Sequence, residues 1–283
     1  MALLLALGSA ASVEGRANTT PDVAFRRVAQ TARASYFSHT GHGVDVERSE
    51  AFLGRLATVF GPAPAGVRVA YYRHPSSAAV REQTGIEALG VTDIEAGRID
   101  SALPFHPHEL VHAVAGRLGR APVLFEEGLA VALTSGGRWG GRDLDGVARA
   151  ALASGVRLEM FLDAFAEQDP EVGYPLAGSF VAYLLDTHGI DAFLAFLAEG
   201  GAGPTRCEIA FRRAFGRSVA NASIGWRAAL ASPRAATAWS WNDPATWPAS
   251  LKRNGSATST ADASRVSGRE PRVAGPLLLG REP

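Results

Sequence analysis

The hydrophobic and polar positions of this chain predict two parts built from different elements. In the first part, residues 22–37 and 46–60 look helical, and apolar side chains from Phe52 to Phe60 recur at helical spacing. A glycine- and proline-rich break at 61–66 separates these helices from residues of strand character. The elements expected next are a strand at 67–72, a short helix from Pro75 to Gln83 and short strands within 86–103.

From Pro104 onward the pattern is mainly helical. The glycine-rich stretch Ser135–Gly141, which carries Trp139, either lines a cleft or connects two helices, and we interpret it as a connection. The helices expected in this part are 107–118, 122–133, Leu144–Ala153, Glu159–Ala166, Tyr174–Thr187, Ile190–Glu199, Glu208–Phe215 and Val219–Ala231.

Composition divides the chain further. After about Ser232 it becomes rich in Pro, Ser, Ala, Arg and Gly, which is typical of a flexible tail. We therefore expect an N-terminal α/β subdomain at 16–103, a helical subdomain at 104–231 and a tail at 232–283. The fold class predicted from these elements is α+β, mainly α.

Residues 1–15 begin with a short apolar run that is followed by small residues. This arrangement resembles the end of a truncated secretory signal, although no basic residue precedes Arg16. The run is far too short to span a bilayer. We therefore expect an exported protein, periplasmic or extracellular, without a transmembrane segment. The alternative is a cytoplasmic protein with an apolar first strand or frayed terminus.

Composition and charge exclude some function classes. The 283 residues carry a formal net charge of zero, and no basic run with interleaved aromatic residues is present, so nucleic-acid binding is not expected. The single cysteine, Cys207, cannot form an intramolecular disulfide. The sequence does not indicate an oligomeric state.

The segment His108-Glu109-Leu110-Val111-His112 carries the clearest candidate chemistry. On a helix, residues four apart lie on the same face, so both imidazoles can reach one metal ion. Glu109 would then lie beside the metal, where its carboxylate can take a proton from a bound water. This is the metallopeptidase signature, and the alternative is a helix with two incidental histidines. His106, just before the helix, either caps it or lines the cleft.

A catalytic zinc site needs a third protein ligand and one open position. Two consecutive carboxylates, Glu126 and Glu127, lie in an apolar run from Pro122 to Leu133 that looks like a buried helix. Burying a carboxylate is unfavourable without a partner, so a ligand role for one of them explains its presence. The alternative is a pair at a helix start, where the macrodipole favours negative charge. The pattern leaves open which carboxylate binds.

These residues resemble the gluzincin metallopeptidases. The resemblance consists of the His-Glu-Leu-Val-His segment, fourteen intervening residues and Glu127-Gly128-Leu129-Ala130, and it covers roughly residues 67–226. It implies that Glu127 is the third ligand and that Glu126 either supports the site or faces solvent. It also implies a zincin-like fold, with a small N-terminal sheet subdomain, whose edge can pair with substrate, and a helical C-terminal subdomain.

Within that family, the short spacer is closer to the small peptidase-MA-like proteins than to the M1 aminopeptidases. The stretch Leu89–Ser101 shows no Gly-x-Met-Glu-Asn strand, with which M1 enzymes grip the free amine of their substrates. The resemblance therefore gives no ground for aminopeptidase activity. Endopeptidase or self-processing activity fits the sequence at least as well.

The resemblance extends to the segment from Tyr174 to Gly189, which is similar to the downstream helix of the family. It implies that Tyr174 donates a hydrogen bond to the developing oxyanion, an interaction worth about 2.7–4 kcal/mol for one good donor. The alternative is an interfacial aromatic residue with its hydroxyl in water. Tyr183 is the second choice, but nine residues along a helix it points away from Tyr174, so both cannot face the metal.

The sequence thus predicts a zinc-dependent peptidase that acts on peptide or protein substrates. His108, His112 and Glu127 are expected to hold Zn²⁺, with Glu109 as the base and Tyr174 as the oxyanion donor. The competing hypothesis is a non-catalytic zinc-binding protein of gluzincin fold that acts as a binding or scaffold module.

Overall fold

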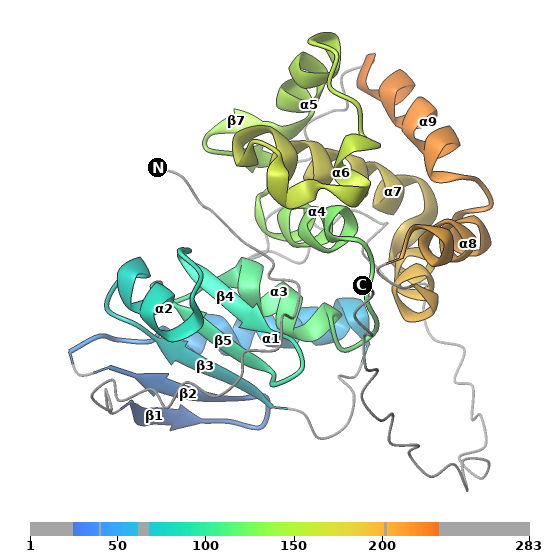
Figure 1. The fold of residues 1–283 in the computed structure, drawn as a ribbon. Helices are drawn as coiled ribbons and strands as arrows, with labels where there is room; N and C mark the ends of the chain where they lie inside the picture. The colour runs from blue at the N-terminus through green and yellow to red at the C-terminus, as the bar shows by residue number, and fades with distance from the viewer. Residues whose placement is uncertain (1–24, 40, 62–67, 201–202, 232–283) are drawn as a thin grey trace, which may run out of the picture. The chain divides into compact units, whose positions relative to one another are not determined.

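The computed structural model describes residues 25–39, 41–61, 68–200 and 203–231 of the chain, drawn in colour in Figure 1. The signal-like segment expected at 1–15 and the tail expected at 232–283 lie outside the described residues, as does most of the break at 61–66. In the described part, the fold is α+β with helix predominating, as the sequence predicts. The expected subdomain boundaries stay predictions.

A five-stranded mixed sheet forms the first part of the described chain (Figure 1). Its strand order is β1-β2-β3-β5-β4, in which β2, β3 and β5 run parallel while β1 and β4 pair antiparallel with their neighbours. Strand β4 is therefore an edge strand among the described residues. The strands are β1 Arg26–Gln30, β2 Ala34–Ser38, β3 Val69–Arg73, β4 Gly90–Asp93 and β5 Arg98–Ser101.

The helix predicted over 22–37 is wrong, because strands β1 and β2 occupy its described residues. In β2, buried Ala34, Tyr36 and Ser38 alternate with partly exposed residues, which is the period of a strand. The pairing of β2 with the distant strand β3 supplies the stabilisation that decides the conformation. The pattern of residues 22–37 alone does not indicate this pairing.

Two helices accompany the sheet. Helix α1 (Val46–Phe60) confirms the helix predicted at 46–60. Helix α2 (Ser77–Thr84) confirms the short helix predicted from Pro75 to Gln83. The buried face of α1 joins the core beneath β2 and β3, and the hydroxyl of Tyr36 donates to a carboxylate oxygen of Glu50 at 2.7 Å. This contact fixes α1 on one face of the sheet.

The second part is helical, as predicted. The two helices expected at Tyr174–Thr187 and Ile190–Glu199 are confirmed: a kink at Gly189, where φ is 79°, separates them, and the first begins earlier, at Pro170. The segment Glu159–Ala166 forms only a short helix and a 3₁₀ turn. The elements are α3 Pro107–Ala115, α4 Val123–Thr134, α5 Leu144–Ala153, α6 Met160–Asp163, the 3₁₀ helix Phe165–Glu167, α7 Pro170–Glu199, α8 Pro204–Phe215 and α9 Val219–Ala231.

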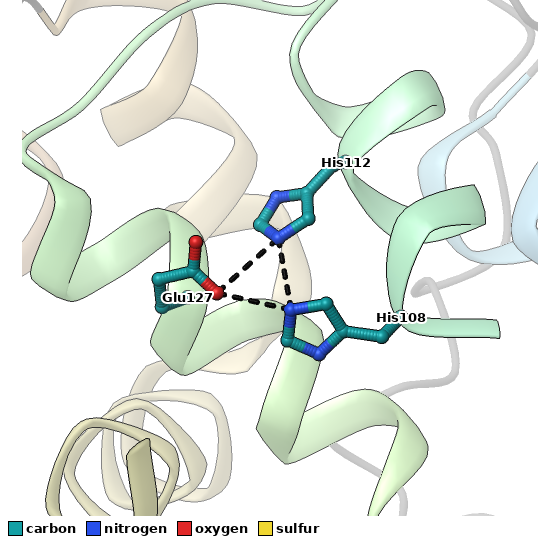
Figure 2. Close-up of side chains that lie close together, drawn as sticks. All are labelled: His108, His112 and Glu127. Atoms are coloured by element: carbon teal, nitrogen blue, oxygen red, sulfur yellow. Dashed lines mark hydrogen bonds and ion pairs between the residues drawn. The ribbon is translucent and has the colours of Figure 1, made fainter. Parts of the chain in front are cut away.

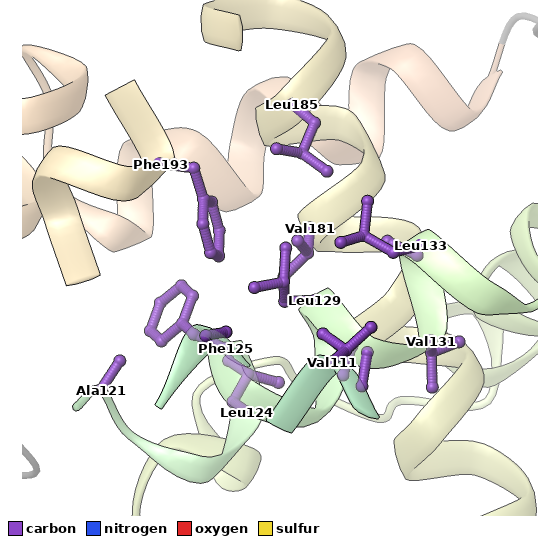
Figure 3. Close-up of a cluster of buried hydrophobic side chains, with 14 of the residues drawn as sticks. Val111, Ala121, Leu124, Phe125, Leu129, Val131, Leu133, Val181, Leu185 and Phe193 are labelled. Carbon is purple, nitrogen blue, oxygen red and sulfur yellow. The ribbon is translucent and has the colours of Figure 1, made fainter. Parts of the chain in front are cut away.

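Helix α4 lies in the middle of the helical part. Every residue from Leu124 to Leu133 is buried, as expected of a helix that is covered on all sides. It packs closely on α7: a Cβ at Gly128 would lie 2.5 Å from a methyl group of Val181 and 2.7 Å from the carbonyl oxygen of Ala177. Figure 3 shows the apolar side chains gathered around this contact.

Helix α7 is long and apolar enough to cross a membrane by length and composition. Part of this helix is buried inside the protein, where it packs on α4, α5 and α8. A core helix passes the same test, so the expected lack of a transmembrane segment stays a prediction.

Candidate metal centre

Three predicted ligands come together between helices α3 and α4 (Figure 2). The Nε2 atom of His108 lies 3.0 Å from Oε2 of Glu127 and 3.0 Å from Nε2 of His112, and the Nε2 atom of His112 lies 3.3 Å from the same carboxylate oxygen. All three side chains are buried. One helix supplies the two imidazoles one turn apart, and the neighbouring helix supplies the carboxylate.

Local sequence explains why the cluster can form. Pro107 begins α3 at a position where no backbone N–H is needed, so the first histidine falls in the first turn. Gly116 ends the helix near the sheet, where a Cβ would lie 2.8 Å from a side-chain carbon of Ile94. Because α4 is buried between α3 and α7, Glu127 has little freedom to turn away from the histidines.

The charges in the cluster balance one another. Burial favours neutral imidazole, yet the charge and hydrogen bond of Glu127 raise the pKa of His112 to about 9. Burial alone would raise the pKa of Glu127, but the two imidazoles outweigh this effect and hold it well below its ordinary value. His112 is therefore protonated near neutral pH, beside an ionised Glu127.

The donor set fits a divalent zinc ion. When zinc has four ligands at about 2.0–2.2 Å, the ligand atoms lie about 3.3–3.6 Å from one another. The distances of 3.0–3.3 Å between Nε2 of His108, Nε2 of His112 and Oε2 of Glu127 are close to this spacing. Two imidazoles and a carboxylate are also a ligand set that zinc takes in hydrolytic sites.

The carboxylate of Glu109 is fully buried beside the cluster. Its Oε2 atom accepts a hydrogen bond of 2.7 Å from the hydroxyl of Thr92. Its Oε1 atom has no hydrogen-bond partner within the described part of the chain. Burying an unpaired polar atom costs about 1–3 kcal/mol, or more for a charged group. This cost indicates that a group from outside the protein pairs with Oε1.

His106 is the N-cap residue of α3, where its backbone carbonyl oxygen accepts from the N–H of Leu110 at 3.2 Å, but its side chain makes no capping hydrogen bond. Its Nδ1 atom lies 3.0 Å from the hydroxyl oxygen of Ser101, and its Nε2 atom lies 4.0 Å from Oε1 of Glu109. Burial lowers the pKa of His106 to about 4. The ring is therefore neutral near pH 7 and adds no charge beside Glu109.

Glu126 lies outside the cluster. Its carboxylate oxygens accept bonds of 2.8 and 3.2 Å from the guanidinium of Arg120 and one of 3.0 Å from the backbone N–H of Ala121. The residue is buried and paired, so the expectation that it faces solvent is wrong. Glu126 ties the start of α4 to the preceding turn.

Tyr174 lies at the edge of the cluster, where its ring centroid is 6.2 Å from that of His108. The residue is only 3% exposed, which disfavours the alternative of an interfacial phenol in water. Burial, reinforced by the charges of Glu127 and Glu109, raises the pKa of Tyr174 above its ordinary value, so its hydroxyl keeps its proton.

Tyr183 points elsewhere, as the helix geometry predicts. A Cβ at Gly225 of α9 would lie 2.5 Å from its hydroxyl oxygen, so its side chain packs on α9. Of the two tyrosines considered, only Tyr174 is near the cluster.

Two neighbours of the site were missed by the sequence interpretation. The stretch Ser135–Gly141 contributes to a short hairpin of β6 (Arg138–Trp139) and β7 (Arg142–Asp143). The indole of Trp139 stacks on the ring of Tyr174, with centroids 5.2 Å apart and planes 4° from parallel. The stretch connects α4 to α5, as interpreted, but it also supplies this stacking contact, for which a tryptophan between glycine pairs was the available signal. Thr92 carried no signal of its own.

A cavity of about 590 Å³ opens beside the cluster. One wall consists of edge strand β4 and the turn that follows it, and the other contains part of the cluster. The lining includes Val91, Thr92, Ile94, Glu109, His112 and Glu127. This volume lies within the range of small-molecule and peptide side-chain sites.

No family model, curated protein or solved structure matches this chain.

Proposed function

We propose that the protein is a zinc-dependent peptidase of the gluzincin type, with a zincin-like fold. The observation that carries this proposal is the convergence of His108, His112 and Glu127 within 4.8 Å. A buried carboxylate, Glu109, lies beside them with one unpaired oxygen. Three protein ligands leave one position open, which distinguishes a catalytic site from a closed structural one.

The two histidines and Glu127 would hold the ion, with both imidazoles neutral. When bound there, a zinc ion supplies a Lewis acid that polarises a peptide carbonyl and lowers the pKa of water. The buried position of Glu127 supports a ligand role, because its charge then has a permanent partner.

Glu109 is the proposed general base. Its Oε1 atom takes a proton from the attacking water as the water oxygen bonds to the carbonyl carbon. The same carboxyl group then gives that proton to the leaving nitrogen as the C–N bond breaks. The products are a carboxylic acid and an amine. Burial of the carboxylate supports this role, because few water molecules compete for its free oxygen.

Tyr174 is the proposed donor to the oxyanion. Its hydroxyl keeps its proton near neutral pH, and its ring is held between Trp139 and Phe165, at centroid distances of 5.2 and 5.4 Å. Strand β4 lies along the cavity and is an edge strand among the described residues, which supports binding of an extended substrate whose backbone can pair with it.

The test compares the wild-type protein with Glu109→Gln for zinc content and for digestion of a proteome-derived peptide library. We expect the variant to retain zinc and to lose turnover by at least about 10²-fold, because an amide cannot accept the proton. Glu87→Gln, an exposed position outside the cavity, is the matched control and should behave as wild type. Full activity of Glu109→Gln would refute the base assignment.

The same experiment addresses the competing hypothesis. A wild-type protein that binds zinc and cleaves no peptide in the library would favour a non-catalytic zinc-binding module. A protein that neither binds zinc nor cleaves peptides would contradict both.

A further inference from the structure

The two oxygens of the Glu109 carboxylate have different surroundings. The hydroxyl of Thr92 lies 2.7 Å from Oε2 and 3.2 Å from the backbone carbonyl oxygen of the same glutamate. A hydroxyl has one proton, and the carboxylate oxygen is here the nearer acceptor. Thr92 therefore donates to Oε2.

The other oxygen, Oε1, accepts no hydrogen bond from the described residues. It is buried without a hydrogen-bond partner in the described part of the chain. The Nε2 atom of His106 lies 4.0 Å from Oε1, which is too long for a hydrogen bond. One oxygen is thus fixed by the protein, while the second can accept a proton from outside it.

The position of Thr92 is itself closely determined. In strand β4 it lies opposite Ile99 of β5, whose side chain is fully buried, so both face the core side of the sheet. Its branched side chain has few χ1 rotamers in a strand. The preceding Gly90 lets β4 approach α3, because a Cβ there would lie 2.8 Å from Cγ of Glu109.

From this geometry we infer that Thr92 is a positioning residue that selects the working oxygen of the base. By holding Oε2, it turns the carboxylate so that Oε1 receives the proton. The inference rests on the proposed peptidase function. It adds that β4, the edge strand of the described sheet that is proposed to bind substrate, also orients the base.

The test uses two substitutions that separate the hydroxyl from the shape of the side chain. Thr92→Val removes the hydroxyl and keeps the branched shape, whereas Thr92→Ser keeps the hydroxyl. We expect kcat to fall roughly 10- to 100-fold in Thr92→Val, with KM within about twofold and zinc content unchanged, because one hydrogen bond to a charged group is lost. Thr92→Ser should retain most of kcat.

A matched control is Thr58→Val. Thr58 is exposed on helix α1 and does not line the cavity, and its hydroxyl donates to the backbone carbonyl oxygen of Gly54 at 3.3 Å. This variant should keep the wild-type kcat. If Thr92→Val does not fold, Thr92→Ala is the replacement, with the same loss of kcat expected.

A second measurement does not depend on activity. In zinc-free protein labelled with ¹³C at the glutamate carboxyl carbons, the Glu109 signal is the one that disappears in Glu109→Gln. We expect this signal to move in Thr92→Val and to stay in place in Thr92→Ser. An unmoved signal in Thr92→Val, or equal loss of kcat in the Ser and Val variants, would overturn the inference. An inactive wild type with a moved signal would reject the peptidase proposal and leave the contact established.

Discussion

At the scale of single residues, the cluster depends on charges that are stable only together. Glu127 is 1% exposed, and an isolated carboxylate so deeply buried would favour its neutral form. The two imidazoles beside it reverse that preference, and Glu127 in turn keeps His112 charged. Glu127 and His112 therefore hold each other in their charged forms.

A pH dependence of the zinc-free protein follows from His112. Its folded pKa of about 9 exceeds the ordinary value of 6.5, so its contribution to stability is fully present below pH 6.5. That contribution is lost as the pH rises through 9. We expect the free energy of unfolding of zinc-free protein, measured with urea, to decrease as the pH rises from 6.5 to 9.

The zinc-loaded protein should not show this loss, because bound imidazole is already neutral. His112→Gln in its zinc-free form is the control and should give a flat profile over the same interval. Unchanged stability of the zinc-free wild type between pH 6.5 and 9 would contradict the proposed charge arrangement.

At the scale of elements, the site depends on the close approach of β4 to α3. Gly90 makes this approach possible, since a Cβ at that position would lie 2.5 Å from Cε1 of His106 and 2.8 Å from Cγ of Glu109. The contact places a strand edge, the proposed base and the helix with two proposed ligands in one small region.

Gly90→Ala should therefore displace Glu109. We expect peptidase activity to fall at least about tenfold and the protein to lose about 1–3 kcal/mol of stability through overpacking. Peptide hydrolysis and thermal unfolding measure the two effects. Gly43→Ala, where a Cβ would meet nothing within 4 Å, should change neither. Wild-type activity of Gly90→Ala would show that the approach does not position the base.

The sequence predicted the elements whose signals are local. The spacing of His108 and His112 places both on one helix face in any context, and the apolar run around Glu127 predicted a buried helix. Strand β2 was missed because its conformation depends on pairing with residues more than thirty positions away. The stacking of Trp139 on Tyr174 likewise joins a hairpin to a separate helix, which spacing alone cannot indicate.

At the scale of the whole molecule, the candidate centre lies where the sheet part meets the helical part of the described chain. Helix α3 contacts both β4 and α4, and α4 in turn packs on α7. A zinc ion bound by His108, His112 and Glu127 would therefore join α3 to the core helix α4. Metal binding and folding stability should be linked, since an ion that binds only the folded state stabilises it.

We propose that Glu127, and not its neighbour Glu126, completes a zinc site with the two histidines. The most direct measurement is the zinc affinity of the wild type, Glu127→Gln and Glu126→Gln, determined by competition with a chelator. We predict one zinc per chain in the wild type and in Glu126→Gln, whose carboxylate pairs with Arg120, and a loss of affinity of at least about tenfold in Glu127→Gln. Equal zinc affinity in Glu127→Gln and the wild type would contradict the account.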